Sequence, residues 1–281
     1  MSEISMKKCI LLIPVLRKVI IFLFRSKIVL NAQREAALEA GRWLLHSRET
    51  TNFTYDLTPL NKRYLASVVA MIVGKPYEYI LGYIDELDTD NDLKKHISAL
   101  TANSGFRFVS DQEPKFARRI GWYAIARAIK PKVIVETGVD KGLGSCILTA
   151  ALMRNKAEGY PGYYYGTDIN PEAGWLLTGR YSEFGRIIFG DSIASLKALD
   201  ARVDLFINDS DHSSDYEEKE YQTIEDRLSE DAIILGDNSH CTDKLFKFAQ
   251  TSGRHFLLFA EKPYQHWYPG GGIGIAFRRG P

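Results

Sequence analysis

Apolar residues follow two different rhythms along the chain, and the rhythm changes near Lys130. Before this point, apolar side chains recur every three or four residues, which is the spacing of one helix face. A clear example is the set Leu60, Tyr64, Leu65, Val68, Val69 and Ile72. After it, apolar residues form short continuous runs separated by helix-length segments. Such runs indicate strands that are buried on both faces of a mainly parallel sheet.

The first rhythm predicts an N-terminal helical region. One helix is expected over residues 32–46 and another from Thr58, because Thr is a good N-cap and Pro59 suits the first helical position. Gly74 and Pro76 separate this helix from one that extends to Leu87. A further helix is expected over residues 93–100.

The second rhythm predicts seven strands. They are expected at residues 132–138, 163–169, 186–191, 203–209, 232–238, 255–261 and 273–279. The connector before the last run is too irregular for a crossover helix, so the seventh strand is predicted to pair antiparallel beside the sixth. The predicted fold is α/β: a doubly wound, Rossmann-like sheet of seven strands, mostly parallel with an antiparallel last strand. We expect the helical region to cover residues 1–112 and the ligand-binding domain to cover residues 113–281.

Residues 7–30 form an apolar segment that is interrupted by Arg17, Lys18 and Arg25. Its longest unbroken apolar run, residues 9–16, is much shorter than the roughly 20 residues that cross a bilayer. Two interpretations stay open. The segment is a helix that packs on its own domain or across a dimer, or it lies in a membrane interface. We expect the protein to form a homo-oligomer. We also expect it to be cytoplasmic, with peripheral membrane contact through residues 7–30 as the alternative.

Composition excludes several classes of partner. The net charge of +1 argues against nucleic acid, because phosphate binding requires a clear basic excess. The three cysteines, Cys9, Cys146 and Cys241, are scattered and form no CxxC pair. They therefore predict neither a disulfide framework nor a zinc site, and they fit a reducing cytosol.

Acidic residues gather where the predicted strands end. The positions are Glu136, Asp168, Asp191, Asp209 and Asp237, the last followed by Asn238. A buried strand rarely tolerates unpaired carboxylates. Ligands of doubly wound sheets bind outside the carboxyl ends of the strands, so these acids predict a ligand site.

A glycine-rich turn follows the first strand and runs from Gly138 through Gly142 to Gly144 and Ser145. Glycines at such a turn allow the backbone to approach a ligand closely. A dinucleotide-binding turn needs a glycine where this chain has Asp140. The turn therefore favours a smaller, cationic ligand over a nicotinamide dinucleotide.

The segments VETGVDKGLGS, GTDIN, GDS and DLFIND followed by SDH resemble the ordered motifs of class I S-adenosylmethionine-dependent methyltransferases. The resemblance covers roughly residues 118–279. It implies that Asp168 binds the ribose hydroxyls and that Asp191 and Ser192 lie near the adenine. The other cofactor residues that it implies are Glu136, Gly138, Gly142 and Ser145. From the residues alone, the alternative is that these acids are helix N-caps, an explanation that suits Asp191 better than Asp168.

Within this class, the chain resembles metal-dependent O-methyltransferases of the catechol and sugar types. The resemblance implies Asp209, Asp237 and Asn238 as ligands of Mg²⁺, which prefers oxygen donors. It also implies His212 as the general base, as in the sugar type. The metal would lower the pKa of an acceptor hydroxyl on a sugar, glycan or secondary metabolite.

Other roles and functions stay open. Asp211 either orients His212 or caps the next helix, and residues 266–268 either overhang the substrate or pack in the core. A metal-independent N- or O-methyltransferase is the second enzyme hypothesis. A membrane-associated protein that keeps the fold without turnover is the third.

Overall fold

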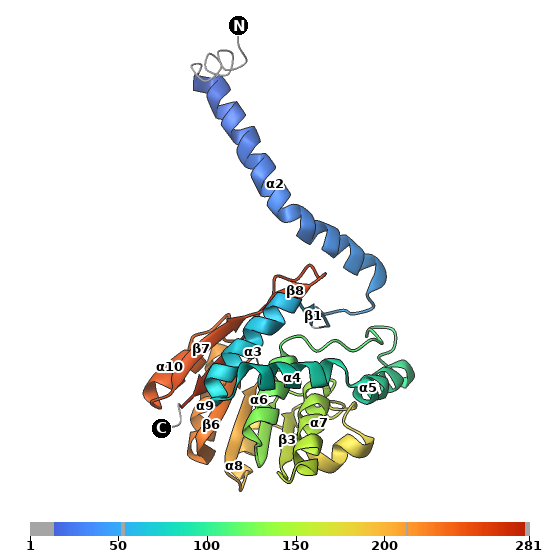
Figure 1. Cartoon of the computed structure of the whole chain (residues 1–281), viewed down its shortest axis with the longest axis vertical. Helices are drawn as coiled ribbons and strands as arrows, with labels where there is room; N and C mark the ends of the chain where they lie inside the picture. The colour runs from blue at the N-terminus through green and yellow to red at the C-terminus, as the bar shows by residue number, and fades with distance from the viewer. Residues whose placement is uncertain (1–13, 52–53, 212, 279–281) are drawn as a thin grey trace. The chain divides into compact units, whose positions relative to one another are not determined.

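The computed structural model describes residues 14–51, 54–211 and 213–278, which form two compact units (Figure 1). Of the described residues, 14–47 together with 265–268 make one unit, and the others, from Arg48 onward, make the second. The unit that contains the sheet thus begins at Arg48 rather than at the expected boundary of 112/113. The position of its N-terminal helices explains this difference.

The smaller unit is built on one long helix, α2 (Pro14–His46). It joins the helix expected over 32–46 to the apolar segment before it. Near its end, the ring of Trp43 meets the rings of His266 and Trp267 edge-on, with centroid distances of 6.2 Å and 5.6 Å. Across the described ranges, no helix has both the length and the hydropathy that a membrane crossing requires.

The larger unit contains a seven-stranded sheet in the order β4-β3-β2-β5-β6-β9-β7. Its strands are β2 (Val133–Thr137), β3 (Tyr163–Asp168), β4 (Gly185–Phe189), β5 (Val203–Asn208), β6 (Leu228–Gly236), β7 (His255–Ala260) and β9 (Gly272–Phe277). Two short strands, β1 (Asp56–Leu57) and β8 (Pro263–Tyr264), pair antiparallel apart from it. The predicted doubly wound α/β fold is confirmed.

The last strand of the sheet, β9, lies between β6 and β7 and runs antiparallel to both. All six of its residues are buried. At Gly274, a Cβ would collide with the side chain of Ser239. The predicted antiparallel pairing of the seventh strand with the sixth is therefore confirmed, and the strand is inserted into the sheet rather than added at its edge.

The helices of this unit form two groups that pack among themselves, α3 to α7 and α8 to α10. Their bounds are α3 (Pro59–Val73), α4 (Tyr77–Asp88), α5 (Asn91–Asn103), α6 (Arg119–Ile129), α7 (Leu143–Ala157), α8 (Ser192–Ala198), α9 (Ser214–Ile224) and α10 (Lys244–Thr251). Short 3₁₀ turns, η1 (Gly179–Phe184) and η2 (Glu225–Arg227), precede β4 and β6.

The N-terminal helices of this unit pack directly on the α/β core. The hydroxyl of Thr58 accepts a hydrogen bond from the Asn61 amide at 3.2 Å, so the predicted N-cap of α3 is confirmed. Leu65 of α3 and Ile80 of α4 are fully buried, and both helices contact α6. A Cβ on Gly121 of α6 would stand 3.1 Å from Leu65. Because α3 and α4 complete the core beside α6, they belong to the same unit as the sheet.

Candidate active site

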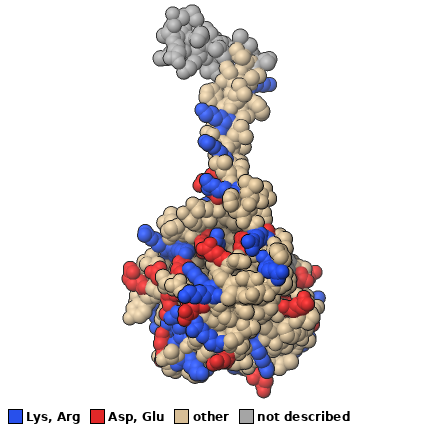
Figure 2. All heavy atoms as spheres, turned by 90° about the vertical axis from the view of Figure 1, so that its right-hand side faces the viewer, with Lys and Arg blue, Asp and Glu red and all other residues tan. Residues whose placement is uncertain are grey.

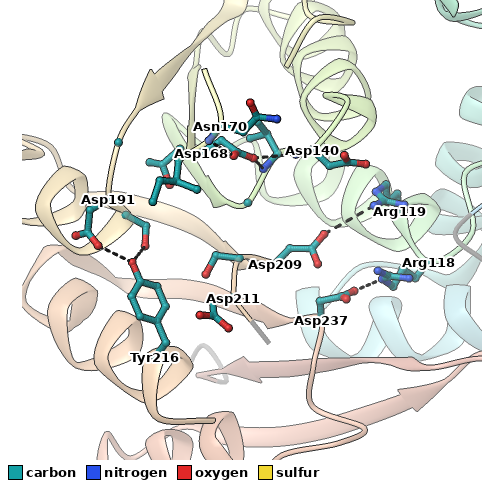
Figure 3. A pocket seen from close by; sticks show the side chains of 17 residues that line it. Arg118, Arg119, Asp140, Asp168, Asn170, Asp191, Asp209, Asp211, Tyr216 and Asp237 are labelled. Atoms are coloured by element: carbon teal, nitrogen blue, oxygen red, sulfur yellow. Dashed lines mark hydrogen bonds and ion pairs between the residues drawn. The ribbon is translucent and has the colours of Figure 1, made fainter. Parts of the chain in front are cut away.

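A cavity of about 510 Å³ opens at the carboxyl ends of β2 to β6 (Figure 3). Its size is that of a small-molecule site. Its charged lining residues are six aspartates and two arginines: Asp140, Asp168, Asp191, Asp209, Asp211, Asp237, Arg118 and Arg119. The excess of carboxylates fits a ligand that carries positive charge.

The turn after β2 requires glycine at its first position. Gly138 has φ = +79°, and a Cβ there would collide with the carbonyl oxygen of Asp209 and with Cα of Ser210. Its amide donates to the carbonyl oxygen of Thr167 at 2.8 Å. Gly142, at φ = +91°, begins α7 as its N-cap. The turn therefore passes directly over the end of β5, which leaves no room for a side chain.

Asp168, at the end of β3, connects this strand to the glycine-rich turn that follows β2. Its Oδ2 accepts hydrogen bonds from the amides of Val139 at 3.0 Å and Asp140 at 3.1 Å, and its Oδ1 accepts from the Asn170 amide at 2.8 Å. Because a carboxylate oxygen accepts two hydrogen bonds, Oδ1 keeps capacity for a ligand hydroxyl. Asp168 lines the cavity, and its predicted contact with the ribose stays a prediction.

Asp191 is the N-cap of α8, since its Oδ1 accepts from the Ala194 amide at 2.8 Å. The N-cap interpretation of this residue is thus confirmed, yet the side chain also lines the cavity. Its Oδ2 accepts a hydrogen bond from the Tyr216 hydroxyl at 2.9 Å. The amide of Ala194, and then Tyr216, lower the pKa of this carboxyl. Tyr216 was not identified from the sequence.

Glu136 lies beneath the site instead of on its surface. It is buried, it does not line the cavity, and the Tyr164 hydroxyl donates to it at 2.5 Å. The Ser145 hydroxyl lies 2.7 Å from that of Tyr164, so the two predicted cofactor residues share one internal network. Burial raises the pKa of Glu136 to about 7, against the effects of Tyr164 and Arg119. Among the described residues, three other predicted site residues also lie outside the cavity lining: Gly142, Ser145 and Asn238.

The raised pKa of Glu136 gives a stability prediction. An ordinary glutamate titrates near 4.5 and this one near 7, so folding favours the protonated form. The contribution to stability is therefore fully present below pH 4.5 and is lost as pH rises to about 7, by about 3 kcal/mol. The Glu136→Gln variant does not titrate at this position, so its free energy of unfolding should rise relative to that of the wild type by about 3 kcal/mol as the pH increases from 4.5 to 8. Urea unfolding of both proteins across this pH range measures the difference. An identical pH dependence in the two proteins would contradict the assignment.

Two further carboxyl groups meet at the ends of the central strands. The Asp209 amide donates to the Thr137 carbonyl at 2.9 Å, and the Asp237 amide donates to the Asn208 carbonyl at 3.0 Å. Their side chains are only 11% and 8% exposed. Burial, and then the negative charge of Asp237, raise the pKa of Asp209 well above its usual range. Both carboxyl groups face the cavity.

Two consecutive arginines at the start of α6 balance these acids (Figure 3). Arg118 forms an ion pair with Asp237 and lies 4.0 Å from Glu261, while Arg119 lies 3.8 Å from Asp209. Cations at a helix N-terminus are disfavoured by the helix dipole, so the carboxylates offset an unfavourable placement. The arginines were missed from the sequence, although two adjacent cations before a buried helix are themselves a signal.

The predicted Mg²⁺ site is only partly assembled by these residues. Asp209 and Asp237 converge, but Asn238 does not line the cavity. Within the described ranges, no group of three or more His, Cys, Asp and Glu side chains is arranged to hold a metal ion. Each of the two carboxylates already pairs with a guanidinium group. A divalent cation would therefore stand beside two fixed positive charges, and the donor set does not fit it.

One buried carboxylate beneath the cavity connects several of the segments that form the site. Glu220 of α9 is fully buried and accepts hydrogen bonds from four polar side chains. These are Thr137 at 3.1 Å, Ser210 at 2.7 Å, Asn208 and Ser192. It thereby joins the ends of β2 and β5 to the start of α8. Asn208, an unusual polar residue in a buried strand, is explained by this contact.

The predicted general base, His212, lies outside the described residues. Its neighbour Asp211 accepts a hydrogen bond from the Ser213 amide at 2.8 Å, just before α9 begins. Asp211 thus stabilises the turn before the helix, but it is not the helix cap, because the N-cap position of α9 is occupied by Ser213. The role of His212 stays a prediction.

Comparisons with known proteins agree with this geometry. A family model described as a methyltransferase domain matches residues 135–239. A methyltransferase structure from Geobacter sulfurreducens is 15% identical and covers 70% of this chain and 96% of its own, with a TM-score of 0.50. The O-methyltransferase TomG from Streptomyces achromogenes, in complex with S-adenosylmethionine, is 16% identical and covers 68% and 91%, with a TM-score of 0.48. The search of curated proteins gave no match. The family model covers the strands and turns that build the cavity, from β2 to the end of β6, so this part of the chain is similar to a methyltransferase domain, and the solved structures share its fold.

Proposed function

We propose that this enzyme transfers the methyl group to a hydroxyl oxygen of a small molecule and that Asp209 accepts the hydroxyl proton. The observation that carries the proposal is the buried pair of carboxyl groups, Asp209 and Asp237, on one wall of the cavity. A hydroxyl is a poor nucleophile until it loses its proton, and a carboxylate within reach supplies the base.

The two ends of the cavity suggest a division of roles. Asp168, Asp191 and Tyr216 line one side, where hydroxyl and amino groups of the nucleoside find hydrogen-bond acceptors. Asp209 and Asp237, with their arginines, line the other side (Figure 3). We assign the first side to S-adenosylmethionine and the second to the acceptor.

The reaction needs a base, a fixed approach and no water. S-adenosylmethionine supplies a sulfonium-bound methyl group, so the carbon–sulfur bond breaks as the new carbon–oxygen bond forms. Asp209 takes the proton that the hydroxyl releases. Arg119, 3.8 Å away, holds the carboxylate in place and compensates its charge before the proton arrives. Alignment of oxygen, carbon and sulfur by the cavity walls provides the rest of the rate enhancement.

The proposal is tested by product analysis. The purified enzyme would be incubated with S-adenosylmethionine, labelled in its methyl group, and a panel of catechols, sugars and other polyhydroxylated small molecules. Labelled methyl ethers are the expected products, in step with S-adenosylhomocysteine release. Transfer to amines alone would overturn the oxygen assignment while leaving the methyltransferase assignment intact.

The choice between His212 and Asp209 as the base is tested with the same substrate. If Asp209 is the base, His212→Gln keeps most of the turnover that Asp209→Asn loses. The opposite order would assign the proton to His212, as the sequence resemblance implies.

Removal of divalent ions tests the metal requirement. Because the carboxylates of Asp209 and Asp237 already pair with arginines, we expect activity to be unchanged within about twofold after dialysis against EDTA. The measurement is S-adenosylhomocysteine release before and after dialysis, with Mg²⁺ added back as the control. Activity that disappears and returns with Mg²⁺ would establish metal-assisted transfer instead.

A further inference from the structure

The first half of α2 exposes a continuous set of large apolar side chains. Phe22, Phe24, Ile28 and Leu30 are each about two-thirds exposed, and Val19, Leu23 and Val29 are exposed as well. These residues point to several sides of the helix rather than to one stripe, since two sets of three, 22–24 and 28–30, are consecutive in the sequence. Monomeric soluble proteins rarely leave such a surface uncovered.

Only positive charges accompany these apolar residues. Arg17, Lys18, Arg25, Lys27 and Arg34 lie on the helix, and no Asp or Glu precedes Glu35 on it. Figure 2 shows separate blue groups among uncharged side chains along the upper part of this helix. Residues 1–34 contain seven Lys or Arg and one Glu, a net charge of +6. Since the whole chain carries +1, the remaining residues carry −5.

This charge distribution distinguishes between two candidate partners of the apolar surface, a second copy of the helix and a lipid membrane. A second copy of the helix would bring five cations against five cations with no acid between them, so pairing of these segments is opposed by charge repulsion. An anionic lipid surface accepts both features, because acyl chains take the apolar side chains and headgroups take the cations. The net negative charge of the rest of the chain disfavours its own contact with that surface.

We propose that residues Pro14–Leu30 of α2 bind the surface of membranes that contain anionic lipids and thereby hold the methyltransferase domain at a membrane. The interrupting cations favour an interfacial position over a crossing, in agreement with the absence of a spanning helix from the described residues. The acceptors within reach would then be membrane-borne or membrane-partitioned molecules.

Vesicle sedimentation of the full-length protein tests the proposal. Vesicles of phosphatidylcholine with about 30% phosphatidylglycerol are compared with vesicles of phosphatidylcholine alone. We expect clear binding only to the first. Because each basic residue near an anionic surface contributes about 1 kcal/mol, Arg25→Gln with Lys27→Gln should weaken binding about 25-fold. Phe22→Ser with Phe24→Ser should weaken it by at least a similar factor.

Leu45→Ser is the matched control, because Leu45 is 82% exposed on the same helix but lies beyond the basic segment. It should bind vesicles like the wild type. Calorimetric binding of S-adenosylmethionine shows that every variant keeps a folded domain. Equal binding to both vesicle types, or binding unaffected by the Phe22 and Phe24 changes, would overturn the proposal. A lower oligomeric mass of the Phe22 and Phe24 variant, without any loss of vesicle binding, would assign the surface to a second copy.

Discussion

Asp209→Asn is expected to lower kcat by about 10²- to 10⁴-fold while the affinity for S-adenosylmethionine stays within about threefold of the wild type. Asparagine keeps the shape of the side chain but accepts no proton from a hydroxyl. The residues assigned to the cofactor, Asp168 and Asp191, lie on other strand ends and are untouched by the change. Turnover would be followed by S-adenosylhomocysteine release, and affinity by calorimetry.

The control for this variant is Asp200→Asn. Asp200 is fully exposed and its carboxylate lies 4.0 Å from Arg227, so the same chemical change should leave both parameters unaltered. Circular dichroism of both variants checks the fold, because Arg119 loses a charged partner in the first. Equal losses of turnover and cofactor affinity would place Asp209 in the cofactor site instead of the acceptor site.

Gly138→Ala is expected to remove S-adenosylmethionine binding and to destabilise the fold by about 3 kcal/mol. Two effects add. The position has φ = +79°, which alanine rarely adopts, and the new Cβ would collide with the backbone of Asp209 and Ser210. The turn must therefore move away from the end of β5. This movement would separate the cofactor side of the cavity from the acceptor side. Urea unfolding and calorimetric titration measure the two losses.

Gly74→Ala separates the steric effect from the conformational one. Gly74 has φ = +62° at the end of α3, but a Cβ there would meet no atom within 4 Å. The free energy of unfolding of this variant should fall by only about 1 kcal/mol, which is the cost of a left-handed backbone conformation for alanine, and the variant should bind the cofactor normally. Similar losses in both variants would show that contact with the β5 end is unimportant.

The sheet was predictable because its central strands, such as β2, β5 and β9, are buried on both faces. Each apolar run that the sequence shows corresponds to one strand, and β6 alone begins clearly earlier, at Leu228. The boundary of the domain was not predictable. An apolar stripe on α3 or α4 shows that one face of each helix is buried, but it does not show which element packs against that face. In this fold that element is α6.

The site divides in the same way. Acids at strand ends were visible in the sequence, because a carboxylate is unusual beside a buried run. Partners that lie on helices were not visible. Glu220 stands among several acids of a polar helix, and only the fold shows that it alone gathers four donors. Glu136 shows the limit of resemblance, since its side chain points below the cavity rather than into it.

The position of β9 has a consequence for how the protein is made. During synthesis β6 and β7 are both completed before β9, the last of the described strands, leaves the ribosome. Each of them then has an unpaired edge that only β9 covers, and exposed strand edges are templates for pairing with other chains. The nascent domain is therefore most prone to aggregation while β9 is missing, and a chaperone that shields strand edges should act at this stage.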